Sequence, residues 1–130
     1  MTAENPLRVL LVENSPIVSE RLLALINGLV RPIRAKIAAT AEAAGRIFGD
    51  LQPDVAVLDI ALPDASGFDL LATFKLSQPA CVVVMLTTYA YSEFRENAAL
   101  LGADFFFSKV SEFEHVADVL SALTVPANHA

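Results

Sequence analysis

Residues 55–67 of the chain read VAVLDIALPDASG, and this stretch decides the fold. Its first four residues are apolar, which is typical of a strand buried on both faces of a parallel sheet. The run ends at a single carboxylate, Asp59, and a loop with Pro63 and Gly67 follows. Open α/β sheets bind their ligands beyond the carboxyl ends of their strands. We therefore expect Asp59 to lie partly buried at such a crevice, where a carboxylate needs a partner, a metal or a chemical role.

The composition describes one domain with a large core. The chain has 130 residues, of which 55% are hydrophobic and 18% charged, enough for one compact domain and too few for two. The longest uninterrupted apolar stretch, residues 80–86, is too short to cross a bilayer, and no signal peptide is visible. A single cysteine, Cys81, agrees with a reducing cytoplasm. The formal net charge of −6 argues against direct nucleic-acid binding.

Strands and helices are expected to alternate along the chain. Apolar runs predict strands over 8–12, 33–38, 55–58, 81–86 and 105–107. Helical spacing predicts helices over 16–30, 41–48, 68–76, 92–101 and 113–120, before a short frayed tail over 125–130. Ser15-Pro16 is a preferred helix start, Gly102 a preferred helix end, and Ser111 to Glu114 fit a capping box.

This order predicts an α/β fold of the (βα)5 type. Right-handed crossovers make it a doubly wound parallel sheet with helices on both faces. We expect the flavodoxin-like strand order 2-1-3-4-5. Residues 1–130 leave no room for a linker, so a single domain with a core over about 7–123 is expected.

Four of the five predicted strands end in polar residues. Because the carboxyl ends of parallel strands meet at one edge, these side chains should cluster although they are distant in sequence. Carboxylate and carbonyl oxygens suit Mg²⁺, and a lysine with a hydroxyl suits phosphate oxygens. The cluster therefore predicts a site for a hard cation and a phosphoryl group, formed by Glu13, Asn14, Asp59, Thr87 and Lys109.

These residues resemble the receiver domain of two-component response regulators. The resemblance covers residues 7–123 and includes the acidic-pair position at 13–14, the loop Asp59-x-x-Leu62-Pro63-x-x-x-Gly67, Thr87 and Lys109. It implies that Asp59 accepts a phosphoryl group from a histidine kinase, a phosphotransfer protein or a small phosphodonor. It also implies that Thr87 and Lys109 contact the phosphoryl oxygens, and that Glu13, Asn14, Asp59 and the Ala61 carbonyl surround Mg²⁺.

The resemblance further implies how such a domain signals. Thr87 and the aromatic ring at Phe106 would move together on phosphorylation. Their movement would reshape the face built from the fourth helix, fifth strand and fifth helix, where a protein target docks. The chain would then be a stand-alone receiver without an output domain. It would not be an enzyme beyond Mg²⁺-dependent self-phosphorylation and autodephosphorylation.

Four positions depart from the family's usual pattern. Glu13 replaces the commoner aspartate, which is a mild change. Asn14 stands where a second acid is usual, which predicts weaker Mg²⁺ binding and altered phosphorylation rates. Val110 follows Lys109 where many members have proline, so that loop should be less fixed. Phe106 replaces a frequent tyrosine, so its movement would depend on packing alone.

The residues leave some alternatives open and close others. The chemistry of aspartate, apart from any resemblance, allows it to act as a nucleophile toward phosphorus. Asn14, however, also suits a pseudo-receiver, which is a docking module that works without phosphorylation. A haloacid-dehalogenase-type phosphatase needs a second acid where this chain has Ala61, and a nucleotide site needs a glycine-rich phosphate loop that is not present. Tyr89, Tyr91 and Phe94 suit either a partner surface or helix packing.

Other residues are expected only to pack. Cys81 begins a buried strand and should be inert. Phe105 and Phe107 should be core residues on the face opposite Phe106, since side chains alternate along a strand.

Overall fold

The computed structural model describes residues 5–124, and in this range strands and helices alternate without exception. The strands are β1 (Leu7–Val12), β2 (Ile33–Ala38), β3 (Val55–Leu58), β4 (Val82–Thr87) and β5 (Phe105–Ser108). The helices are α1 (Pro16–Asn27), α2 (Ala41–Leu51), α3 (Gly67–Ser77), α4 (Ser92–Leu100) and α5 (His115–Ala122). All neighbouring strands are parallel, in the order β2-β1-β3-β4-β5. The predicted fold class and strand order are confirmed.

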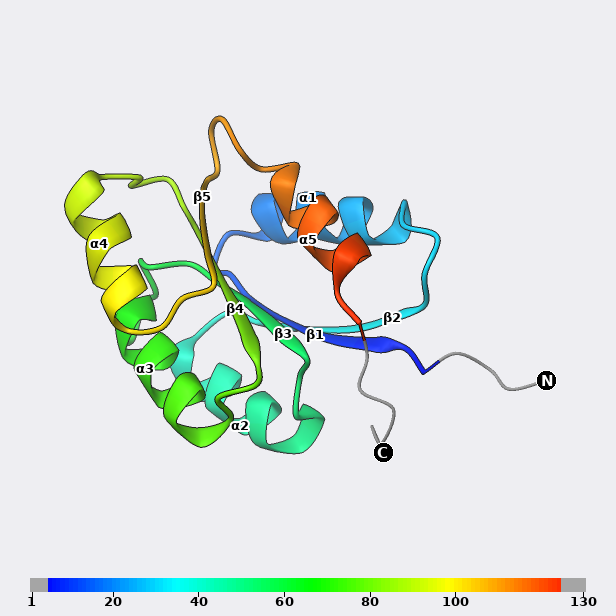
Figure 1. The fold of residues 1–130 in the computed structure, drawn as a ribbon, viewed down its shortest axis with the longest axis horizontal. Coiled ribbons are helices and arrows are strands. Elements are labelled where there is room, and N and C mark those ends of the chain that lie inside the picture. The colour runs from blue at the N-terminus through cyan, green and yellow to red at the C-terminus, as the bar shows by residue number, and fades with distance from the viewer. Residues whose placement is uncertain (1–4, 125–130) are drawn as a thin grey trace.

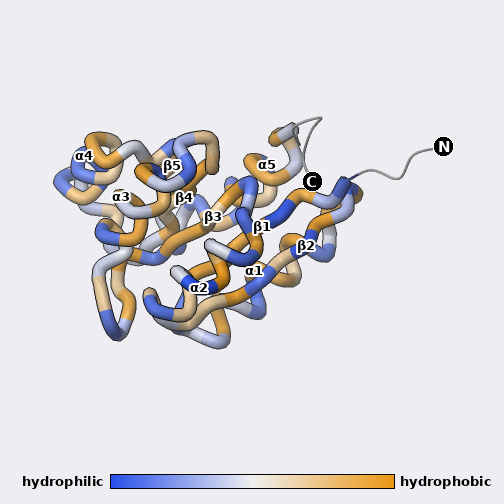
Figure 2. Tube along the Cα trace, turned by 90° about the horizontal axis from the view of Figure 1, so that it is seen from below, coloured by the Kyte–Doolittle hydropathy of each residue, from blue (hydrophilic) through white to orange (hydrophobic). Residues whose placement is uncertain are grey.

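The sheet lies between two layers of helices (Figure 1). Helices α1 and α5 cover one face, and α2, α3 and α4 cover the other. Alternate residues of β1 serve the two faces: Leu10 and Val12 join the core under α2 and α3, while Val9 and Leu11 join the core under α1 and α5. Strands buried on both faces are mostly apolar, which is why β3 is entirely apolar and why β1 and β4 each contain a single polar residue, Arg8 and Thr87 (Figure 2).

Several local predictions are confirmed. Ser15 caps α1 by accepting a hydrogen bond from the Val18 amide, and Pro16 occupies the first turn. Gly102 follows α4 with a φ of +98°, a left-handed conformation that favours glycine. No helix in residues 5–124 is long and apolar enough to cross a membrane.

The predicted capping box at Ser111 to Glu114 is wrong. Helix α5 begins at His115 after Glu114, whose side chain makes no capping hydrogen bond. The carboxylate of Glu112 instead accepts a hydrogen bond from the backbone amide of Ser108, at 3.0 Å. The Glu112 side chain therefore closes the turn after β5 and does not cap the helix.

The prediction for the phenylalanines of β5 is only partly correct. Phe106 is 8% exposed, and Phe105 and Phe107 lie together on the opposite face with ring centroids 5.8 Å apart. Phe107 packs against the core under α1 and α5, but Phe105 is 38% exposed. Strand β5 is an edge strand, and Phe105 is its first residue. The tail over 125–130 lies outside the described residues.

Candidate functional site

The ends of four strands form one cluster at the carboxyl edge of the sheet. Glu13, Asp59 and Lys109 each follow a strand directly, and Thr87 is the last residue of β4. Backbone hydrogen bonds fix these positions against the neighbouring strand: the Asp59 amide donates to the Val12 carbonyl at 3.1 Å, and the Lys109 amide to the Thr87 carbonyl at 2.9 Å. Regular parallel pairing therefore sets the spacing of the side chains that follow.

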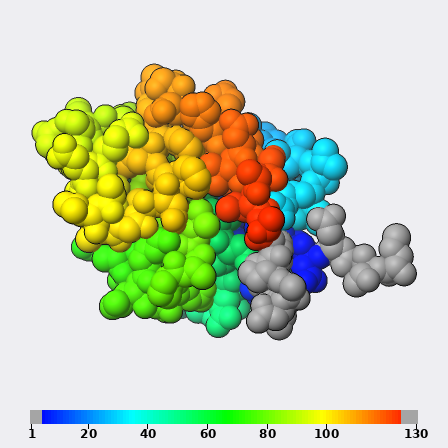
Figure 3. All heavy atoms as spheres, in the orientation of Figure 1, coloured from blue at the N-terminus to red at the C-terminus, as the bar shows by residue number. Residues whose placement is uncertain are grey.

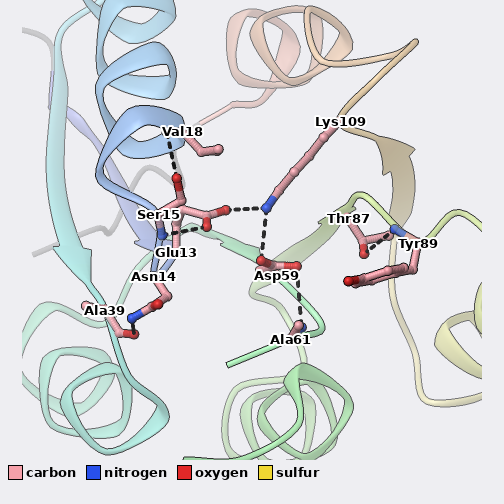
Figure 4. A network of polar contacts seen from close by, with 10 residues as sticks. All are labelled: Glu13, Asn14, Ser15, Val18, Ala39, Asp59, Ala61, Thr87, Tyr89 and Lys109. Carbon is pink, nitrogen blue, oxygen red and sulfur yellow. Dashed lines mark hydrogen bonds and ion pairs between the residues drawn. The ribbon is translucent and has the colours of Figure 1, made fainter. Parts of the chain in front are cut away.

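Lys109 bridges the two carboxylates of the cluster (Figure 4). Its Nζ lies 2.7 Å from Glu13 Oε1 and 2.9 Å from Asp59 Oδ2. All three side chains are nearly buried: 11% of the Lys109 side chain is exposed, 4% of Glu13 and 10% of Asp59. Buried carboxylates are tolerated only when they are paired, and here one ammonium pairs with both.

The ion pairs change the acidity of Lys109. Burial lowers the pKa of its ammonium, but hydrogen bonds to Glu13 and Asp59 and the charges of both carboxylates outweigh burial and raise the pKa above its ordinary value. The lysine is therefore a fixed positive charge at neutral pH. A phosphoryl group placed beside Asp59 would meet this charge directly.

The remaining carboxylate oxygens differ in how firmly they are held. Glu13 Oε2 accepts a hydrogen bond from the Ser15 amide at 2.9 Å. Asp59 Oδ1 accepts only a long one, from the Ala61 amide at 3.4 Å. Asp59 therefore keeps one oxygen that a ligand can engage at little cost.

Asn14 is not brought into this cluster. Its side chain is turned toward Ala39, whose carbonyl accepts a hydrogen bond from Asn14 Nδ2 at 3.2 Å (Figure 4). Among residues 5–124, no group of three or more His, Cys, Asp or Glu residues could hold a metal ion. The oxygen donors of Glu13, Asp59 and the Ala61 carbonyl still suit a hard cation such as Mg²⁺. The two carboxylates fit the ion, and in this structure the Asn14 side chain is turned toward Ala39.

The loop between Asp59 and Gly67 is closed tightly on itself. The Gly67 amide donates to the Ile60 carbonyl at 2.8 Å, and Ala61 and Ser66 form an antiparallel bridge. A Cβ atom on residue 67 would lie 2.0 Å from the Asp59 carbonyl oxygen. Only glycine fits there, which explains physically why the predicted loop motif ends in Gly67.

The same loop is tied to helix α2 through Asp64, which the sequence analysis missed. Its carboxylate accepts hydrogen bonds from the Ala41 and Glu42 amides, at 2.8 and 3.0 Å. These bonds lower the pKa of the Asp64 carboxyl. A carboxylate at a helix N-terminus is favourable, but the partner lies more than twenty residues away, so no local pattern reveals it.

Thr87 lies on the side of Asp59 away from Glu13 (Figure 4). It is fully buried, and its Oγ1 accepts a hydrogen bond from the Tyr89 amide at 3.0 Å, whereas Thr88 is exposed. Tyr89 and Tyr91 are 47% and 57% exposed, while Phe94 packs edge-on against Phe68 of α3.

Phe106 is held by Arg95 of α4, a second contact that the sequence analysis missed. The guanidinium carbon lies 4.7 Å from the Phe106 ring centroid, and Arg95 Nη1 donates to the Phe106 carbonyl at 3.0 Å. The ring therefore has a cation–π partner in addition to its packing.

Cys81 matches its predicted role as a packing residue. It is 3% exposed, and burial raises the pKa of its thiol to about 12. The thiol is therefore protonated at neutral pH, as expected of an inert buried cysteine.

Comparisons with known proteins show which family the chain matches. The family model for the response regulator receiver domain matches residues 9–121. The chain is 31% identical over 103 residues to the transcriptional regulatory protein MctR of Rhizobium johnstonii, covering 79% of this chain and 48% of that protein. It is 34% identical over 119 residues to the probable transcriptional regulatory protein TcrX of Mycobacterium tuberculosis, covering 91% of this chain and 50% of that protein. The chain thus spans about half the length of these curated relatives.

Solved structures share the fold. The Mn²⁺-bound form of response regulator Rcp1 superposes with a TM-score of 0.79 at 21% identity, over 94% of this chain and all of that one. At this identity the likeness shows the fold alone.

Proposed function

The chain belongs to the response regulator receiver domain family of two-component systems, and from this membership we propose that Asp59 accepts a phosphoryl group. Receiver domains are signalling modules that interact with histidine kinases and phosphotransfer partners and generally depend on Mg²⁺. The observation that carries the proposal is the buried Asp59 carboxylate, 2.9 Å from Lys109 and with one oxygen weakly engaged.

The proposed step is a direct transfer between the donor and Asp59. A carboxylate oxygen of Asp59 forms a bond to phosphorus, while the bond from phosphorus to the donor's nitrogen or oxygen breaks. The donor is a phosphohistidine of a kinase or phosphotransfer protein, or a small phosphodonor, and it leaves with the electron pair of the broken bond. The product is an acyl phosphate on Asp59.

The residues of this chain contribute position and charge to the step. Phosphoryl transfer requires little covalent help from the protein beyond alignment and charge neutralisation. The Lys109 ammonium, already paired with Asp59, would contact a phosphoryl oxygen, and the buried Thr87 hydroxyl would contact another. Glu13, Asp59 and the Ala61 carbonyl would hold Mg²⁺, which neutralises phosphoryl charge when bound. Asn14 would weaken that site, because it supplies no carboxylate.

The added phosphoryl group would change the conformation near Thr87 and Phe106. It carries a charge of roughly −1.5 to −2 and strong acceptor oxygens, enough to draw Thr87 and Lys109 toward Asp59. This movement would shift the balance between two conformations of the face formed by α4, β5 and α5. We propose that a protein target reads this face, and that residues 1–130 work as a single, non-enzymatic receiver domain. A cytoplasmic location suits its one buried thiol.

A second candidate is the pseudo-receiver, which docks a partner without being phosphorylated. The observation that favours it is Asn14, which is turned to Ala39 and leaves the proposed metal site with two carboxylates. Under this alternative, Lys109 is a permanent structural bridge between Glu13 and Asp59.

Intact-mass spectrometry after incubation with a small phosphodonor and Mg²⁺ separates the two candidates. We expect one phosphoryl adduct on the wild-type chain, none on Asp59→Asn, and less than a tenth of the wild-type adduct when Mg²⁺ is chelated. Asp69→Asn is the matched control, because Asp69 is an exposed carboxylate on α3, and it should be phosphorylated like the wild type. A wild-type chain that takes no adduct at saturating donor would contradict the proposal and favour the pseudo-receiver.

A further inference from the structure

The turn that carries Lys109 is closed by one side chain, that of Glu112. Glu112 bonds both backbone groups of Ser108: its Oε1 accepts from the Ser108 amide at 3.0 Å, and its own amide donates to the Ser108 carbonyl at 2.9 Å. Ser108 is the last residue of β5 and directly precedes Lys109. Glu112 therefore fixes the backbone from which the lysine side chain extends.

The inside of the turn is held by the Ser108 hydroxyl. Its Oγ accepts hydrogen bonds from the amides of Val110 and Ser111, at 3.1 and 3.4 Å. Val110 itself is 81% exposed. Because Val110 does not restrict the backbone as a proline would, we infer that these hydrogen bonds restrict it instead. That the loop is less fixed than in chains with proline at this position stays a prediction.

Glu112 is in turn held between two helices. Its Oε1 lies 3.7 Å from Arg95 Nη2 on α4, and its Oε2 lies 3.9 Å from His115 Nδ1 on α5. Arg95 also donates to the Phe106 carbonyl on β5. Figure 3 shows α4 (yellow) and the β5–α5 segment (orange) side by side on one face of the molecule. The orientation of the Glu112 carboxylate therefore depends on the placement of both helices.

We propose that Glu112 is a positioning residue for Lys109: it locks the turn after β5 so that the Lys109 ammonium stays within hydrogen-bonding distance of Asp59. This role rests on the proposed phosphoryl transfer to Asp59, to which Glu112 itself makes no contact. Reacting groups displaced by about 1 Å can lose on the order of a hundredfold in rate. A turn held by hydrogen bonds to one carboxylate should therefore affect the rate while leaving donor binding unchanged.

The first test measures phosphorylation kinetics with a small phosphodonor. We expect Glu112→Ala to lower the maximal rate several-fold with an unchanged half-saturating donor concentration. Glu112→Gln, which keeps an acceptor for the Ser108 amide, should recover most of that loss. Glu114→Ala is the matched control, because Glu114 is exposed and its side chain makes no capping bond, and it should behave as wild type.

A double-mutant comparison asks whether Glu112 acts through Lys109. If it does, adding Glu112→Ala to Lys109→Ala should cause no further loss, because the two residues form one coupled unit. An undiminished further loss in the Lys109→Ala background would overturn the proposal, since Glu112 would then act elsewhere.

A second readout does not depend on phosphorylation. Brief acetylation with acetic anhydride, followed by peptide mapping, reports how well each lysine amine is protected. We expect Lys109 to react several-fold faster in Glu112→Ala than in Glu114→Ala. Lys75, which is paired with Asp104 at 2.7 Å, should stay equally protected in both and so report intact folding. Equal Lys109 labelling in the two variants would overturn the proposed role of Glu112. A wild-type chain that takes no phosphoryl group would instead contradict the proposed function, and it would leave the labelling result unaffected.

Discussion

At the scale of single residues, the site depends on one lysine shared by two carboxylates. Glu13 and Asp59 follow strands that are adjacent in the sheet, and Lys109 reaches both from β5. The ammonium keeps two buried negative charges close together in the absence of a ligand. It is also the charge that an incoming phosphoryl group would contact. The same contact thus serves the stability of the free protein and the proposed chemistry.

Replacement of Lys109 tests the stabilising part of this contact through its pH dependence. We expect Lys109→Met to lower the free energy of unfolding by about 1–3 kcal/mol at pH 7, since it leaves buried acceptors unpaired. The folded-state pKa of Lys109 is raised, so its contribution is fully present below the ordinary lysine pKa and is lost as pH rises through the folded-state pKa. Urea unfolding from pH 7 to pH 11 should therefore show that the difference in free energy of unfolding between the wild type and Lys109→Met becomes smaller above about pH 10.4. A gap that stays constant would mean that the ion pairs do not stabilise the fold.

Asn14 allows a separate test of the metal site. Asn14→Asp adds a carboxylate beside Glu13, and we expect Mg²⁺ to bind roughly tenfold more tightly, a change of about 1.4 kcal/mol. A fluorescence or calorimetric titration measures the affinity, with Asn27→Asp at the end of α1 as the control for added charge. Unchanged affinity in Asn14→Asp would place residue 14 outside the metal shell.

At the scale of elements, the loops after β3 and β5 make more hydrogen bonds than their sequences suggest. The loop after β3 is closed by a bridge and by Gly67, and is tied to α2 by Asp64. The turn after β5 is closed by Ser108 and Glu112. Both loops carry groups of the candidate site, so these contacts help to hold the site in place.

Substitutions at two glycines distinguish a steric clash with the backbone from the ordinary effect of glycine on helix stability. We expect Gly67→Ala to lower the free energy of unfolding by about 3 kcal/mol or more, because its Cβ would lie 2.0 Å from the Asp59 carbonyl oxygen. Gly45→Ala, in α2 with nothing within 4 Å of the added Cβ, should instead stabilise the protein by about 0.5–1 kcal/mol. Urea unfolding curves of the two variants measure the difference. A similar, small effect of both substitutions would contradict the tight closure of the loop after β3.

At the scale of the whole molecule, hydrophobic periodicity was enough to predict the fold. Continuous apolar runs identified β3 and β4 as strands buried on both faces, and right-handed crossovers predicted a doubly wound parallel sheet. The strand order, which the structure confirms, came from the flavodoxin-like arrangement of such sheets. Topology then placed Glu13, Asp59, Thr87 and Lys109 at one edge without any knowledge of their contacts. Asp64, Arg95 and Glu112 were not predicted, because their partners depend on loop conformation and side-chain rotamers, which leave no period in the sequence.

The relation to the curated relatives also belongs to this scale. The matched regions make up about half of MctR and TcrX. The similarity therefore concerns the receiver domain. It says nothing about the activity of those whole proteins. What the shared fold supplies is a site, and the central claim is that its Asp59 is the residue that is phosphorylated.

Borohydride reduction of the phosphorylated protein tests that claim most directly, because it converts an acyl phosphate on aspartate to homoserine and so marks the residue permanently. After treatment with a small phosphodonor and Mg²⁺, peptide mapping should find homoserine at position 59 and at no other aspartate, and none when donor is omitted. Homoserine at another aspartate, or none at position 59 under saturating donor, would contradict the assignment of Asp59 as the phosphoacceptor.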